Sequence, residues 1–188
     1  MKKSITVFVI FIIVLSLLAF VSFKAVDMIR EYLYPREFET FVIKYSQEFD
    51  VPEALIYSVI LAESNFDPDA KSHVGAIGLM QLMPDTLDWL SRLLGETAPT
   101  GDIADPETNI KYGTYYLRHL MDRFDSWDTA IAAYNAGHGR VTNWLTDSRY
   151  SDDGVNLKNI PYEETRNYVN RINYNFEQYK KIYYNGDA

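Results

Sequence analysis

The sequence contains no cysteine and only three histidines, at positions 73, 119 and 138. The lack of cysteine excludes disulfides, thiol nucleophiles, Cys-ligated zinc and lipid attachment through an N-terminal cysteine. The few histidines include no HExxH pattern, which argues against a histidine-based metal site. The SDDG stretch at 151–154 resembles part of a calcium loop. A complete EF-hand pattern would need aspartate at 149, where Arg149 stands, and a later glutamate that is missing.

Positive charge is also scarce. The sequence has 18 lysines and arginines against 26 aspartates and glutamates, which gives a net charge of −8. Phosphate backbones require basic surfaces, so this balance excludes nucleic acid as a partner. Hydrophobic residues make up 47% of the 188 residues and aromatic residues 15%. A chain of this length and composition can bury a real core, which predicts one folded domain after any targeting segment.

The N-terminus carries a long apolar run. Lys2 and Lys3 precede an uncharged stretch from Ile5 to Phe23. Nineteen helical residues cover about 28 Å, close to the roughly 30 Å hydrocarbon core of a bilayer. The end of this run and the residues after it, LLAFVSFKAVD at 17–27, offer no good small-x-small cleavage site, so residues 1–29 are predicted to be an uncleaved signal anchor rather than a signal peptide.

The two N-terminal lysines favour a cytoplasmic N-terminus, whereas Lys24 and Arg30 beyond the run slightly weaken that orientation. We therefore expect a single-pass protein of the cell membrane. Its domain, residues 30–188, is expected on the extracytoplasmic side.

The rest of the chain shows helical periodicity and no convincing strand, repeat or low-complexity tract. Pro35 marks a boundary in the first predicted helix, and Ser126 is a candidate N-cap. In the second amphipathic helix, Thr86, Leu87, Leu90, Leu93 and Leu94 are spaced for one face. The fold class is therefore predicted to be mainly α, with helices at 30–49, 53–64, 84–94, 107–124, 127–134, 139–145 and 161–184.

One carboxylate stands on an apolar helix face. Counting back from Glu63 by three, four and seven residues gives Ile60, Val59 and Ile56. Burial on such a face favours the protonated carboxyl and raises its pKa, as a general acid requires. The alternative is that Glu63 simply emerges into water at the helix C-terminus, where the macrodipole disfavours its charge.

The residues that follow suit a sugar ligand. Gly75 and Gly78 allow close backbone approach, and Gln81 can both donate to and accept from hydroxyl and acetamido groups. In the segment from Tyr134 to Gly137, an aromatic side chain and an amide side chain are followed by a turn. The chain contains ES at 63–64, GLMQLMP at 78–84, DPETNI at 105–110, AYNAG at 133–137 and IPYEETRNYV at 160–169.

In this order and spacing, these segments resemble the catalytic domain of the soluble lytic transglycosylases, over roughly residues 40–184. The resemblance implies a lysozyme-like α fold. It also implies cleavage of the β-1,4 bond between N-acetylmuramic acid and N-acetylglucosamine in peptidoglycan, with a 1,6-anhydro product and no cofactor. One departure is His138, where the family commonly has proline after AYNAG, and we expect an altered loop there rather than lost chemistry.

The resemblance also implies roles for individual residues. Glu63 matches the single catalytic acid and base. Ser64 and Asn135 match motif residues with a structural role, and Asn135 is counted with the substrate-binding set. The positions that match the glycan groove and its support are Ser72, Gln81, Met83, Tyr134 and Glu164.

Two other functions are compatible with the same residues. A hydrolytic muramidase would prefer a second carboxylate near the groove, and nothing in the spacing of the nearby aspartates singles one out. An inactive glycan-binding scaffold of an envelope machine would not need Glu63. The partners predicted are glycan strands of peptidoglycan and the membrane, with recruiting machinery left undefined.

Overall fold

The computed structural model describes residues 2–97 and 103–184, with side chains from residue 11 onward. Its chain divides into two units, residues 1–36 and 37–188. Within the described ranges the regular elements are helices, with two isolated antiparallel bridges between Lys71, Ile77 and Leu82 and no strand. The prediction of a mainly α fold is confirmed.

The first unit is the helix α1 (Lys2–Leu33), which is continuous over 32 residues. Its segment Phe11–Leu33 contains an 18-residue window with a mean hydropathy of 2.2 and is long and apolar enough to cross a membrane. The predicted apolar N-terminal helix is therefore present, and it continues past residue 29. The predicted helix over 30–49 is instead two helices, because Pro35 lies between the end of α1 and the next helix.

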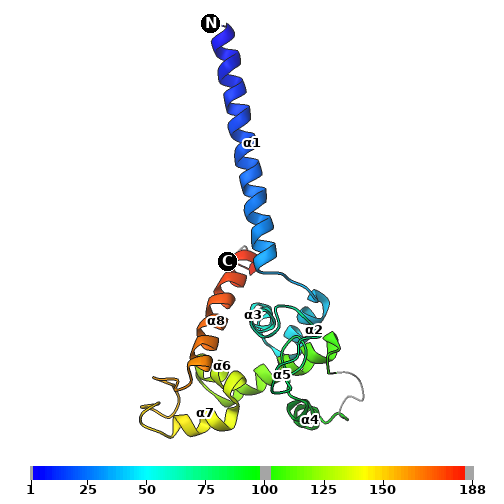
Figure 1. The fold of residues 1–188 in the computed structure, drawn as a ribbon, viewed down its shortest axis with the longest axis vertical. Coiled ribbons are helices and arrows are strands. Elements are labelled where there is room, and N and C mark those ends of the chain that lie inside the picture. The colour runs from blue at the N-terminus through cyan, green and yellow to red at the C-terminus, as the bar shows by residue number, and fades with distance from the viewer. Residues whose placement is uncertain (1, 98–102, 185–188) are drawn as a thin grey trace. The chain divides into compact units, whose positions relative to one another are not determined.

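The second unit is built from seven α-helices and a π-helical turn within its described residues (Figure 1). Those after residue 50 agree with predicted helices to within a few residues, and the predicted helix 161–184 covers both the last α-helix and the π-helical turn, whereas the first one begins at residue 39 and not at 30. In chain order they are α2 (Glu39–Phe49), α3 (Glu53–Glu63), α4 (Pro84–Leu93), α5 (Pro106–Arg123), α6 (Trp127–Ala136), α7 (His138–Leu145), α8 (Glu163–Tyr179) and η1 (Lys180–Tyr184).

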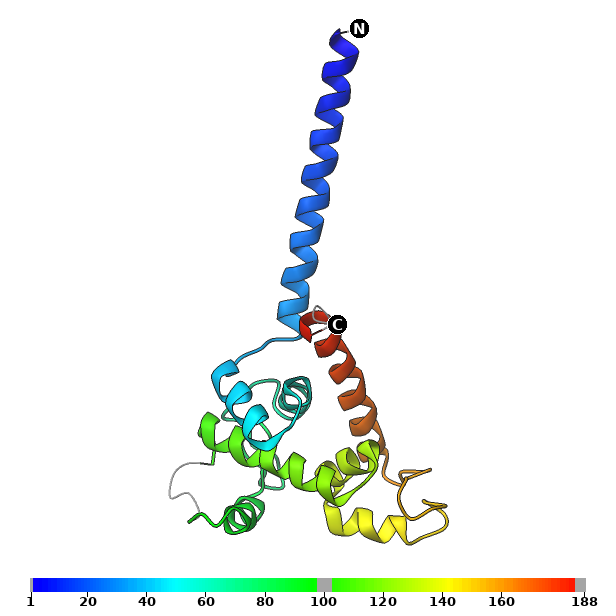
Figure 2. The same ribbon diagram turned by 180° about the vertical axis from the view of Figure 1, so that it is seen from behind.

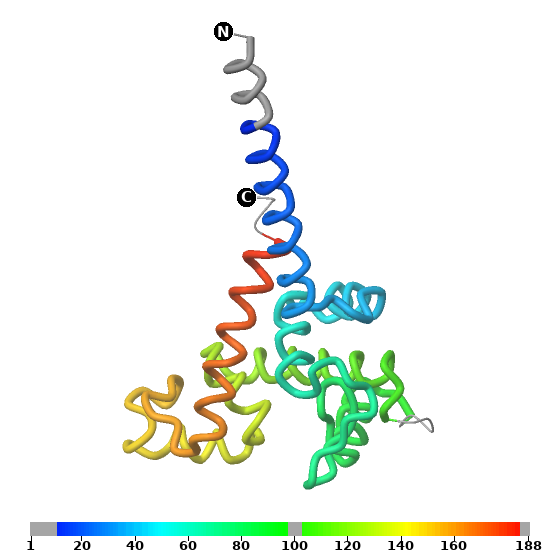
Figure 3. The backbone as a smooth tube through the Cα atoms, turned by 45° about the horizontal axis from the view of Figure 1, so that its top comes forward, coloured from blue at the N-terminus to red at the C-terminus, as the bar shows by residue number. Residues whose placement is uncertain are grey.

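The core of this unit forms around α3, whose residues 54–60 are all buried. α3 packs against α2 and α8, while α5 contacts α2, α4 and α6. Figure 2 shows α5 running between α2 and α4 on one side and α7 with its loop on the other. In Figure 3 the loop after α7 lies beside the first turns of α8. A helix buried on all sides places its last residue next to several elements at once.

Local signals explain the helix boundaries. Asp105 caps α5 by accepting a hydrogen bond from the Thr108 N–H at 2.9 Å, and Pro106 occupies the first turn. Gly137, with φ of 88°, separates α6 from α7. Ser126 does occupy the N-cap position of α6, but its side chain makes no capping hydrogen bond.

One leucine of the predicted apolar face of α4 is not buried. Leu87 and Leu90 are buried, whereas Leu93 is 46% exposed. At about 100° per residue, Leu93 lies roughly 110° from the centre of the arc that Leu87, Leu90 and Ser91 define. The buried stripe of α4 is therefore narrower than its leucine content indicates.

Candidate active site

Glu63 is the last residue of α3 and stands on its buried face. Ile56, Val59 and Ile60 on the same face are fully buried, as the spacing predicts, and Glu63 itself keeps partial access to solvent. Desolvation raises the pKa of the Glu63 carboxyl to about 7. A carboxyl with this pKa is substantially protonated near neutral pH and can donate a proton.

Three residues of α8 surround this carboxyl. Glu164, Tyr168 and Arg171 follow the i, i+4, i+7 spacing of one helix face. Tyr168 and Arg171 lower the pKa of Glu63, and the negative charge of Glu164 raises it. The Arg171 guanidinium lies 5.7 Å from the centre of the Tyr168 ring. Sequence reasoning named Glu164 but missed Tyr168 and Arg171, which the helical spacing from Glu164 could have indicated.

The contact between Tyr168 and Glu63 is loose. Tyr168 is 2% exposed, and its hydroxyl makes no hydrogen bond of ordinary geometry to the described residues. It is close enough to Glu63 for each group to shift the pKa of the other, and burial raises the pKa of Tyr168 further. A buried hydroxyl with a spare donor beside the carboxyl can tighten its bond when Glu63 becomes charged.

A short hairpin-like loop leads from α3 to α4. Ser72 closes its first turn, because its Oγ accepts from the Ala76 N–H at 2.9 Å. Gln81 adopts a left-handed conformation, with φ of 49°. Its Nε2 donates to the carbonyls of Ala70 and Gly78 at 3.1 and 2.9 Å. Since both partners are acceptors, the amide orientation is fixed, and the Gln81 amide group braces the loop from within.

Two catalytic-motif side chains meet on neighbouring carbonyls of this loop. Ser64, the residue after Glu63, donates to the Leu79 carbonyl at 2.9 Å. Tyr134 of α6 donates to the Met80 carbonyl at 2.8 Å. The loop therefore ties the end of α3 to α6, and the three segments that carry Glu63, Gln81 and Tyr134 form one connected unit.

Asn109 of α5 also belongs to this connected unit. It was not identified from the sequence. It is fully buried, and its Oδ1 accepts from the Met80 N–H at 2.7 Å. Its Nδ2 donates to the carbonyls of Ile77 and Ile103, both at 2.9 Å. The available signal was the DPETNI segment, where an asparagine one turn after the Asp105 cap points into the core.

The remaining predicted site residues take different positions. Asn135 Oδ1 accepts from the Thr165 hydroxyl at 2.8 Å, which joins α6 to α8. Met83 is 38% exposed at the start of α4. Glu164 is exposed, and the Tyr134 hydroxyl bonds the Met80 carbonyl instead, so the expected bracing of Tyr134 by Glu164 is not observed.

His138 begins α7 directly after Gly137. Its ring stacks on Trp89 with centroids 5.5 Å apart, and His119 packs against the same indole edge-on at 5.0 Å. Trp89 in turn contacts Tyr116, which contacts Tyr134. The residue that replaces the expected proline thus joins an aromatic row that leads to Tyr134, and the helix start is kept.

The chemistry available to this site is proton transfer by a single carboxyl. Among the carboxylates of the described residues, Glu164 is the one whose charge raises the Glu63 pKa. Asp67, Asp69, Asp85 and Asp88 are all exposed and do not act on it. Fold and site together define a lysozyme-like, all-α domain built around one acidic residue.

The chain belongs to the transglycosylase SLT domain family, whose model matches residues 40–156. It is 36% identical over 163 residues to the soluble lytic murein transglycosylase of Escherichia coli K12, covering 84% of this chain and 25% of that protein. It is 26% identical over 189 residues to the membrane-bound lytic murein transglycosylase C of Actinobacillus succinogenes, covering 86% and 52%.

Solved structures give the same result. The 70-kDa soluble lytic transglycosylase of Escherichia coli aligns with a TM-score of 0.72 at 32% identity, covering 84% of this chain and 26% of that one. An inactive Glu-to-Gln variant of the Pseudomonas aeruginosa enzyme Slt aligns at 0.69 and 35%, covering 79% and 24%. The chain thus spans about a quarter of the length of these soluble relatives, and the predicted family and lysozyme-like fold are confirmed.

Proposed function

We propose that this protein is a peptidoglycan lytic transglycosylase in which Glu63 acts first as acid and then as base. The observation that carries the proposal is the buried, partly accessible Glu63 carboxyl with a pKa of about 7. It stands where the Ser64–Leu79 and Tyr134–Met80 hydrogen bonds bring three motif segments together. Relatives named as lytic murein transglycosylases support the substrate class.

The proposed reaction needs only one protein carboxyl. Glu63 protonates the oxygen of the β-1,4 bond as that bond breaks, and the 2-acetamido group of N-acetylmuramic acid stabilises the positive anomeric carbon. The C6 hydroxyl of the same sugar then attacks that carbon, while the Glu63 carboxylate takes its proton. An intramolecular nucleophile is already positioned, which removes much of the entropic barrier. The product carries a 1,6-anhydro ring, and the reaction consumes no water.

The other predicted residues bind or position the glycan in this proposal. Gln81 presents its Oε1, since its Nε2 is occupied by Ala70 and Gly78. Met83 is an exposed apolar contact at the groove, and Glu164 is available to a sugar hydroxyl. Ser72, Tyr134 and Asn135 act by holding the loop and the α6–α8 junction.

We also propose that α1 anchors the protein in the cell membrane as a single uncleaved span, with residues 30–188 on the extracytoplasmic side. The apolar segment Phe11–Leu33 and the relatives described as membrane-bound support this arrangement. Peptidoglycan lies outside the cytoplasmic membrane, so this topology places the domain with its substrate. Peptidoglycan strands and the membrane are then the partners that the function requires.

The test is mass spectrometry of fragments released from purified peptidoglycan by the full-length protein in detergent, with Glu63→Gln as the control. We expect muropeptides that end in a 1,6-anhydro ring, lighter by one water than hydrolysis products, and none from the control. Reducing ends instead would identify a muramidase and make Glu164 the second carboxylate to examine. Binding to peptidoglycan without any release would favour an inactive scaffold.

A further inference from the structure

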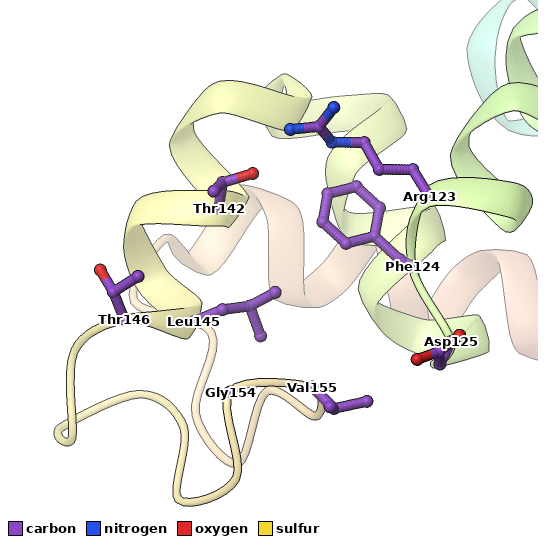
Figure 4. Close-up of a pocket in the computed structure, with 8 residues that line it drawn as sticks. All are labelled: Arg123, Phe124, Asp125, Thr142, Leu145, Thr146, Gly154 and Val155. Carbon is purple, nitrogen blue, oxygen red and sulfur yellow. The ribbon is translucent and has the colours of Figure 1, made fainter.

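A cavity that Glu63 does not line lies in the second unit. Its volume is about 330 Å³, and it is bounded by the end of α5, by α7 and by the loop that follows α7 (Figure 4). None of its lining residues belongs to α3, α8 or the loop of Gln81. The proposed catalytic mechanism leaves this cavity unused.

The floor of the cavity is apolar. α5 ends at Arg123, and Phe124 leaves the helix in an extended conformation, with φ of −120° and ψ of 119°. This turn directs its ring toward α7, where Figure 4 shows Leu145 pointing into the same space. Phe124 is 7% exposed, so its ring is fixed by packing. Such a floor favours methyl and methylene groups by about 25 cal/mol per Å² buried.

The outer wall is held in place by the loop's own hydrogen bonds. Thr129 of α6 donates to the Val155 carbonyl at 3.1 Å. Asp153 Oδ2 accepts from the Asn156 side-chain amide at 2.8 Å, and its Oδ1 accepts from the N–H groups of Asn156 and Val155 at 2.8 and 2.9 Å. These bonds hold the pKa of Asp153 well below its usual range. A wall formed before binding spares a ligand the cost of ordering it.

Opposite charges stand on either side of the floor. The Arg123 guanidinium is exposed and makes no ion pair with the described residues, and Figure 4 shows it reaching over the Phe124 ring. Asp125 points away from it on the other side of Phe124 and is likewise outside the ion pairs of the described chain. The Arg123 guanidinium lies 5.7 Å from the centre of the Phe124 ring, so a positive charge stands at the edge of the apolar floor.

We propose that this cavity binds the short peptide carried by the muramic acid residues of peptidoglycan. Such a peptide presents free carboxylates, an amino group and small aliphatic side chains. Arg123 pairs with a carboxylate, Phe124 and Leu145 hold the aliphatic part, and Asp125 faces the amino group. The proposal rests on the proposed function and adds a peptide-binding site to it, which would favour strands that keep their peptides.

The kinetic test compares glycan strands that bear peptides with the same strands after amidase treatment, using full-length protein. Arg123→Glu should raise KM on peptide-bearing strands about 3- to 10-fold, leave kcat unchanged, and have no effect on stripped strands. Arg92→Glu makes the same charge change at an exposed position of α4. It should leave KM unchanged on both peptide-bearing and stripped strands. Equal KM increases on both substrates, or no increase on either, would overturn the proposal.

A binding test separates this proposal from the catalytic one. The amidase-released peptide is titrated into ¹⁵N-labelled Glu63→Gln protein, with and without Arg123→Glu. We expect saturable shifts of the Thr142 and Val155 amide signals that Arg123→Glu removes. If wild-type protein cleaves no peptidoglycan but these shifts occur, only the proposed catalysis fails. If the shifts are absent, the cavity is not a peptide site.

Discussion

Asn109 holds the backbone of Met80, whose N–H donates to Asn109 Oδ1 at 2.7 Å in the fully buried interior. The carbonyl of the same Met80 accepts from the Tyr134 hydroxyl. One residue of α5 thus supports, through the backbone of Met80, the loop that links Glu63 and Gln81. Asn109 is a positioning residue, because it acts on the site only through this backbone.

Substituting Asn109 should therefore damage both stability and turnover. Asn109→Ala removes one buried and two partly buried hydrogen bonds and leaves the Met80 N–H without its acceptor, at about 2–4 kcal/mol of unfolding free energy. The Ile77 carbonyl keeps the bond that it accepts from the Leu82 N–H. We expect kcat to fall at a temperature where the variant is still folded. The pH at which activity declines should not move, because the α8 residues around Glu63 are untouched.

Thermal unfolding and the pH profile of muropeptide release measure these effects. Asn143→Ala, at an exposed position of α7, is the matched control and should change neither. A pH profile displaced by Asn109→Ala would show that Asn109 acts on the Glu63 proton instead of on loop position.

The glycines of the loop should differ in a predictable way. Gly75 and Gly78 both have positive φ, of 93° and 82°, so alanine is strained at either position. A Cβ at Gly75 meets open space, whereas one at Gly78 would lie 2.7 Å from Asn109 Cγ. Gly75→Ala should lower the free energy of unfolding by about 1 kcal/mol. Gly78→Ala should lower it clearly more and should also reduce activity. Equal melting temperatures for the two variants would contradict this packing.

Opposite charges on α8 should shift the pH profile in opposite directions. In the proposed mechanism cleavage needs protonated Glu63, so activity should fall as pH rises through its pKa of about 7. Glu164 raises this pKa and Arg171 lowers it. Glu164→Gln should therefore move the alkaline limb to lower pH and Arg171→Gln to higher pH, by a few tenths of a unit to about one unit.

The measurement is the initial rate of muropeptide release between pH 5 and 9 at low ionic strength, where screening is weak. The quantity to compare is the pH at which the rate declines on the alkaline side, regardless of the maximal rate of each variant. Shifts of the same sign in both variants would mean that a group other than Glu63 controls the limb.

Glu63 should also make stability depend on pH. Its folded-state pKa of about 7 lies above the ordinary value of 4.5, so the folded protein binds more protons between these values. Stability then falls as pH rises from about 4.5 to 7, by an amount on the order of 1–3 kcal/mol, and the loss is complete above pH 7. Glu63→Gln removes the charge and should melt roughly 3–10 °C higher than wild type at pH 8.5.

At pH 4.5 and below, wild type and Glu63→Gln should melt alike, because the native carboxyl is neutral there. Glu48→Gln, at an exposed position of α2, controls for the general loss of negative charge and should show no such pH-dependent gain. A Glu63→Gln melting temperature that tracks wild type at both pH values would mean that Glu63 is not desolvated.

The spacing alone predicted that Glu63 shares a helix face with Ile56, Val59 and Ile60, and the structure has this buried face. The prediction holds because helical periodicity is a local property. The same holds for most helix boundaries, where proline, glycine and the Asp105 cap act within a few residues. Leu93 shows where local reasoning fails, since burial depends on how wide a face the neighbouring helix covers.

The sequence by itself therefore determined the helical class, the apolar N-terminal helix, the family and the one carboxylate placed on a buried face. Tertiary structure alone decided what surrounds that carboxylate. Tyr168 and Arg171 lie more than a hundred residues from Glu63, and Asn109 reaches Met80 across 29 positions. Such contacts depend on how helices pack, and packing is fixed by the whole core and not by any segment's own pattern.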